Sequence, residues 1–120
     1  MRLAVALCAA LAFAGGDVRA QESAALADGA VLRGLDKITT ELRDLELANG
    51  EAGQVGALTV ELVECRHPAG NPAGDAYAHV VIRETGNGKL WFDGWMLASS
   101  PALNALEHPR YDVWVMRCTT

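Results

Sequence analysis

The chain has 120 residues, of which 51% are hydrophobic and 21% charged, and its formal net charge at pH 7 is −5. This length suits one domain with a single hydrophobic core. Because no cluster of Lys and Arg accompanies the acidic balance, composition argues against nucleic acid or an anionic membrane surface as a partner.

Residues 1–20 are predicted to be a secretory signal peptide. Arg2 precedes an apolar run from Leu3 to Ala14, and Val18-Arg19-Ala20 resembles a cleavage site, so we expect cleavage near Ala20. The apolar run is shorter than the ~20 residues that a spanning helix needs. The mature chain is therefore expected in the periplasm or secreted, without insertion into a membrane.

The mature chain is predicted to begin without structure and then to enter a sheet. Residues 21–30 are small, Ala-rich and without a period, which is typical of a flexible leader. Val31–Asp36 is predicted to be the first strand, in which Gly34 marks a bulge or a close backbone approach. Residues 41–48 have helical propensity, but the Asn49-Gly50 turn signal behind them favours a strand in a hairpin.

Three central segments show the properties of strands. Leu58–Cys65 alternates clearly. One face carries Leu58, Val60 and Leu62, and the other carries Thr59, Glu61, Val63 and Cys65. Tyr77–Glu84 follows a Pro- and Gly-rich loop and precedes a Gly86-Asn87-Gly88 turn. Leu90–Leu97 is apolar on both faces, so we expect it to be covered on both sides or to face a groove.

A short helix is predicted between the last two strands. Ser100 can cap the free backbone N–H groups, and Pro101 suits the first helical position. Leu103 and Leu106 then lie one turn apart for packing. The helix must end before Pro109, because the residue ahead of a proline is pushed out of helical geometry.

Tyr111–Cys118 is the last predicted strand, with Cys118 on the face opposite Tyr111. With about six strands and one short helix near the C-terminus, the chain is predicted to be mainly β. The expected fold is a small antiparallel β-sandwich or open barrel, formed by residues 31–120 as a single domain.

Two cysteines, Cys65 and Cys118, remain once the segment that holds Cys8 is removed. Two thiols in an oxidising compartment usually pair. The alternatives are a redox pair or zinc ligands, but the chain has no Cys-x-x-Cys motif and no histidine spacing of zinc type. We therefore expect a structural disulfide, which would stabilise the fold by about 4 kcal/mol through closure of a loop.

A binding surface is predicted at Trp91, Asp93, Trp95, Glu107 and His108, where aromatic and charged side chains are concentrated. Glu107 lies near the C-terminal end of the predicted helix, where the helix dipole disfavours an anion, so a partner such as Arg110 is expected. The two tryptophans can stack on a sugar, although tryptophans at strand spacing more often belong to the core.

Catalysis has less support than binding. Hydrolysis of a polysaccharide needs two carboxyl groups flanking one bond, and Asp93 and Glu107 are the available pair. The histidines His67, His79 and His108 lack the spacing of metal ligands. We expect no catalytic residues, no metal and no cofactor.

The segment Gly94–Cys118, GWMLASSPALNALEHPRYDVWVMRC, resembles the C-terminal signature of a bacterial family, domain of unknown function 2155. VLRGLDKIT at Val31–Thr39 and LTVELVEC at Leu58–Cys65 resemble its opening motif and its central strand. The resemblance covers Val31–Cys118, and Glu41–Leu47 departs from it by being more charged and more helix-like. It implies an exported single-domain protein of the kind found mainly in alphaproteobacteria, and it supplies no catalytic residues.

These observations predict an exported periplasmic or cell-envelope protein that acts as a binding or structural accessory module. Its expected partner is another envelope protein or a glycan. The alternative is a cell-wall or polysaccharide hydrolase, cellulase-like, that uses Asp93 and Glu107.

Overall fold

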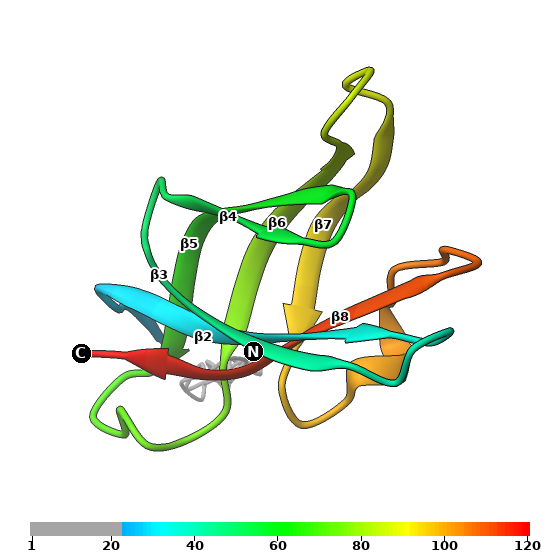
Figure 1. Ribbon diagram of the computed structural model, residues 1–120. Helices are drawn as coiled ribbons and strands as arrows, with labels where there is room; N and C mark the ends of the chain where they lie inside the picture. Colours follow the sequence, from blue (N-terminus) through cyan, green and yellow to red (C-terminus); the bar gives the residue numbers. More distant parts are fainter. Residues whose placement is uncertain (1–22) are drawn as a thin grey trace, which may run out of the picture.

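The computed structural model describes residues 23–120, which form two antiparallel sheets packed face to face (Figure 1). The strands of the smaller sheet cross those of the larger sheet steeply, as in an orthogonal packing (Figure 1). The predicted signal peptide, residues 1–20, lies outside the described residues. Within the described range, no helix is long and apolar enough to cross a membrane.

The larger sheet has the order β1-β5-β6-β7, with β4 also paired to β5, and the smaller sheet has the order β3-β2-β8. The strands and the single 3₁₀ turn of residues 23–120 are β1 (Ala24–Leu26), β2 (Gly29–Asp36), β3 (Leu42–Ala48), β4 (Ala52–Val55), β5 (Leu58–Pro68), β6 (Tyr77–Glu84), β7 (Leu90–Leu97), η1 (Pro101–Leu103) and β8 (Tyr111–Thr119). The predicted antiparallel β-sandwich is confirmed, and across these residues the sheets do not close into a barrel.

The hydrophobic core lies between the two sheets. Leu58, Val60 and Leu62 of β5 are fully buried, as their alternation predicts, and they face Leu32 and Val115 of the smaller sheet. Full burial of each such side chain stabilises the fold by roughly 1.5–3 kcal/mol.

The prediction of a flexible leader is wrong for residues 24–30. Ala24–Leu26 pairs with the C-terminal half of β5, and Gly29 and Ala30 already belong to β2. Ala27 and Ala30 are buried. Short alanine-rich segments carry little alternation, so only the pairing with β5 reveals this edge of the sheet.

The ambiguous segment at residues 41–48 forms β3, an arm of a hairpin with β2, as the turn signal favoured. The strand β4 was not predicted, because its sequence, AGQV, contains Ala and Gly and shows no alternation. Gly34 permits a close approach, because a Cβ atom there would lie 2.5 Å from Cγ2 of Val55.

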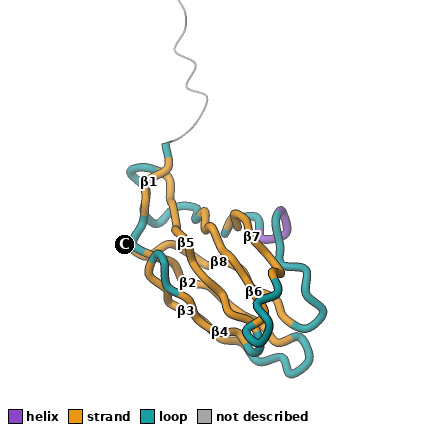
Figure 2. Tube along the Cα trace, turned by 90° about the horizontal axis from the view of Figure 1, so that it is seen from above, coloured by secondary structure: helices purple, strands orange, loops and turns teal. Residues whose placement is uncertain are grey.

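The predicted helix is wrong in length and packing, because only Pro101–Leu103 forms a 3₁₀ turn, which lies beside β7 at the far side of the fold from β1 (Figure 2). The Ser100 side chain caps no described backbone group, although its carbonyl accepts a bond from Leu103 N at 3.1 Å. Leu103 is 72% exposed, whereas Leu106 is buried. Asn104 ends the turn with an extended backbone and donates its side-chain amide to the carbonyl oxygen of Trp95 at 2.9 Å.

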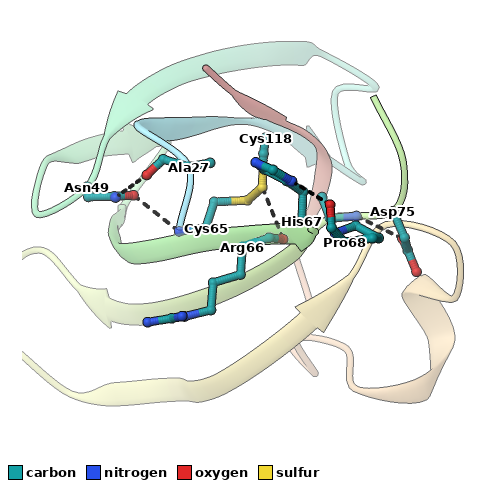
Figure 3. Close-up of a disulfide and its surroundings, with 9 residues drawn as sticks. Ala27, Asn49, Cys65, Arg66, His67, Pro68, Asp75 and Cys118 are labelled. Carbon is teal, nitrogen blue, oxygen red and sulfur yellow. Dashed lines mark hydrogen bonds between the residues drawn. A yellow bond between two sulfur atoms is a disulfide. The ribbon is translucent and has the colours of Figure 1, made fainter. Parts of the chain in front are cut away.

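Both cysteines face the core, contrary to the predicted alternation. Val63 is an extra residue in the pairing of β5 with β6, and Met116 is an extra residue in the pairing of β8 with β2. Each β-bulge turns over the residues that follow it. Cys65 and Cys118 are therefore buried and form the predicted disulfide, with their Cα atoms 5.8 Å apart (Figure 3).

Candidate functional site

A third bulge divides the five predicted site residues. Trp91 is the extra residue where β7 pairs with β6, and its side chain packs against the core. Asp93 and Trp95 instead contact His79, which projects outward from β6 between two buried neighbours. The predicted surface therefore divides into two separate sites, and Glu107 belongs to neither of them.

The first site, which we call the outer-face cluster, consists of His79, Asp93 and Trp95 on the exposed face of the larger sheet. His79 lies directly opposite Trp95 in the β6–β7 ladder, and the two rings stack with their centroids 5.2 Å apart. His79 Nε2 lies 2.8 Å from Asp93 Oδ1. The indole is thus held in place although Trp95 remains 38% exposed.

The backbone of Trp95 is held as firmly as its side chain. Its carbonyl oxygen accepts the Asn104 amide, and Gly94 leaves room for this contact, since a Cβ atom there would lie 2.8 Å from Asn104 Nδ2. The outer-face cluster therefore presents a partly exposed indole that is stacked on an imidazole, with a carboxylate bound to that imidazole. Such a surface can stack on an apolar face of a ligand while hydrogen-bonding its polar edge.

The second site, the His108 corner, lies where the chain turns into β8. His108 Nδ1 is 3.0 Å from the backbone N of Arg110 and 3.1 Å from that of Tyr111, so the ring nitrogen accepts both N–H groups. The Trp91 ring meets the His108 ring edge-on, with centroids 4.3 Å apart. Trp91 Nε1 donates to Glu84 at 2.6 Å, which fixes the indole.

Burial lowers the pKa of His108 below its ordinary value, since it disfavours the charged imidazolium. Lys37 and Lys89 act in the same direction through charge repulsion, while the Glu84 carboxylate opposes them. Lys37 Nζ also donates to the backbone carbonyl of His108 at 2.6 Å. The corner is therefore built around a neutral histidine.

Glu107 takes no part in either site. It is exposed, and within residues 23–120 it forms no hydrogen bond or ion pair. The expected partner, Arg110, instead binds Asp36 Oδ2 through Nε and Nη2 at 3.1 and 2.9 Å, and this contact holds the pKa of Asp36 at about 2. No contact among the described residues joins Glu107 to Asp93, so the geometry lends no support to the hydrolase interpretation.

Sequence reasoning missed His79 as a partner of Trp95 and Asn104 as its support. The sequence did contain a signal for His79. In a hairpin centred on Asn87 of the Gly86-Asn87-Gly88 turn, His79 and Trp95 are equally far from the centre and therefore lie opposite each other. Asn104 gave no such signal, since it was expected inside a helix. Among residues 23–120, no group of three or more His, Cys, Asp or Glu is arranged to hold a metal ion.

The family model described as "Uncharacterized protein conserved in bacteria (DUF2155)" matches residues 30–118. The chain is also 31% identical over 87 residues to "Uncharacterized protein RP359" of Rickettsia prowazekii (strain Madrid E), a match that covers 70% of this chain and 56% of that protein. The chain thus spans about half the length of this curated relative. No solved structure matches the chain.

Proposed function

The chain belongs to the bacterial family DUF2155, and we propose that it is an exported cell-envelope protein that binds a glycan through the outer-face cluster. The observation that carries this proposal is the arrangement of Trp95, an exposed indole that stacks on His79 and belongs to a backbone segment that Asn104 fixes. A ligand therefore meets a surface that needs little ordering on binding, which lowers the entropic cost of association.

Two features support export. Residues 1–20 have the pattern of a secretory signal peptide. The Cys65–Cys118 disulfide suits an oxidising compartment, since cytosolic reductants keep most protein thiols reduced.

A glycan matches the chemistry of the outer-face cluster because a sugar ring has apolar C–H faces and a rim of hydroxyl groups. The Trp95 indole offers an apolar face to the ring. Asp93, whose side chain is 53% exposed, can accept hydrogen bonds from hydroxyl groups, and the His79 imidazole beside it adds a further polar group. The cluster lies on an open sheet face, so an extended chain of sugars can pass across it.

Titration calorimetry of the mature protein against soluble cell-wall glycan fragments and other bacterial polysaccharides tests the proposal. We expect Trp95→Ala to weaken binding by at least about tenfold, because stacked aromatic contacts dominate such surfaces. Trp114→Ala is the matched control, since Trp114 is a partly buried tryptophan in β8 on the other sheet and should leave binding intact. If no glycan binds and an envelope protein instead crosslinks at Trp95, the ligand is a protein and the glycan proposal fails.

A further inference from the structure

Residues 98–110, which we call the strap, run from β7 to β8 and connect the edge strands of the two sheets. The orange segment of Figure 1 shows this path along one side of the sandwich. Leu106 anchors the middle of the strap in the core, and Asn104 anchors it to β7 through the Trp95 carbonyl. The far end is held by the His108 ring, by the bond from Lys37 Nζ to the His108 carbonyl, and by the ion pair of Arg110 with Asp36.

The contact at that far end requires one protonation state of His108. A ring nitrogen that accepts two backbone N–H groups carries no proton, so the neutral ring has its proton on Nε2. A proton on Nδ1 would instead point at the N–H groups of Arg110 and Tyr111. Both hydrogen bonds exist only in the neutral form.

The same turn geometry occurs elsewhere in the chain without this sensitivity. Asp36 Oδ1 accepts the backbone N–H groups of Ile38 and Thr39, two and three residues ahead, as His108 does with Arg110 and Tyr111. Asp36 keeps its charge because its pKa is about 2. Imidazole, in contrast, ordinarily titrates near pH 6.5, within the range that an envelope protein meets.

We propose that His108 is a proton-operated latch, so that acid breaks its bonds to Arg110 and Tyr111 and loosens the turn at the far end of the strap. The groups around the ring set the direction of the response. Lys37 and Lys89 are the cations that act on it, and Glu84 is the carboxylate that opposes them, while the Arg110 guanidinium is paired with Asp36. The Tyr111 ring also packs against the His108 ring, with their centroids 5.2 Å apart.

The latch stays closed at neutral pH, because burial and the two lysines disfavour the imidazolium. Once these two bonds are broken, the imidazole reaches water and takes up its proton at its ordinary pKa. As the pH falls below about 6.5, the equilibrium therefore shifts toward the state in which the turn at His108 is open.

Amide hydrogen exchange measured by NMR at about pH 7 and at about pH 5 tests the latch, with protection factors corrected for the intrinsic effect of pH on exchange. In the wild-type protein we expect the protection of the Arg110 and Tyr111 amides to fall by at least about tenfold in acid. In His108→Asn the amide oxygen can accept the same N–H groups without titrating, so the loss should disappear. His79→Asn, which removes a histidine from the outer-face cluster, should show the same loss of protection in acid at the Arg110 and Tyr111 amides as wild type.

The ring itself gives a second measurement that needs no variant. Nitrogen chemical shifts at neutral pH should show Nδ1 without a proton and Nε2 with one. A protonated Nδ1 at neutral pH overturns the proposal, as does equal protection of the two amides at both pH values. Glycan titration at both pH values separates the two claims, because absence of binding at any pH overturns the proposed function and leaves the latch to be judged by exchange.

Discussion

The sulfur atoms of Cys65 and Cys118 join the centre of the larger sheet to the edge of the smaller sheet, because a bulge in each strand turns its cysteine inward. Without the extra residues Val63 and Met116, strand alternation would place both side chains on outer faces. The disulfide thus depends on two irregularities in pairing that lie close to the cysteines in sequence, and it links strands that are not neighbours in either sheet.

The disulfide leads to the first prediction. Free-thiol titration of the unfolded, unreduced mature protein should detect no thiol, since Cys65 and Cys118 are paired. The double variant Cys65→Ala, Cys118→Ala should lose about 2–4 kcal/mol of unfolding free energy in urea, because the unfolded chain is no longer constrained. Two reactive thiols in the untreated protein would contradict the pairing.

Asn49 is the basis of the second prediction. Its side chain donates to the Ala27 carbonyl at 2.7 Å and accepts from Cys65 N at 3.1 Å, so it joins three separate segments (Figure 3). Asn49→Ala should lower the unfolding free energy by about 1–3 kcal/mol, because it leaves partly buried backbone groups unpaired. Asn87→Ala, in an exposed turn, is the matched control, and an equal loss in both variants would contradict this role.

Gly94 gives a third prediction that probes the support of Trp95. Gly94→Ala places a methyl group 2.8 Å from Asn104 Nδ2, and should cost about 0.5–1.5 kcal/mol of stability, because displacing that side chain breaks its hydrogen bond to the Trp95 carbonyl. Gly86→Ala is the control, since a Cβ atom at Gly86 meets nothing within 4 Å. In an Asn104→Ala background, the cost of Gly94→Ala should shrink, and a double-mutant cycle measured by urea unfolding shows whether it does.

The ion pair of Asp36 with Arg110 gives a prediction on pH. Arg110 is the main cause that lowers the pKa of Asp36 from 3.8 to about 2, so the folded state favours the carboxylate. The resulting stability is present above about pH 4 and is lost as the pH falls through about 2. Asp36→Asn should therefore destabilise the protein at neutral pH, and this difference from wild type should disappear near pH 2 in urea unfolding curves. A constant difference across this range would contradict the assignment.

Local patterns in the sequence were sufficient for most of the strands. Leu58, Val60 and Leu62 alternate because one face of β5 is buried, and Gly86-Asn87-Gly88 marks the hairpin that joins β6 to β7. The pairing of Cys65 with Cys118 followed from their number and their expected compartment. These features depend on nearest neighbours or on counting, so the sequence by itself determined them.

Only the tertiary structure decided which face Cys65, Cys118 and Trp91 occupy, because each follows or forms a bulge. A bulge is a mismatch between two strands, so the alternation within one strand cannot reveal it. For the same reason Trp91 separated from Asp93 and Trp95, whereas Glu107 and His108 lie in the connection that precedes β8. The helix predicted beyond Ser100 likewise ends early, at Asn104, whose side chain binds the Trp95 carbonyl of the edge strand β7.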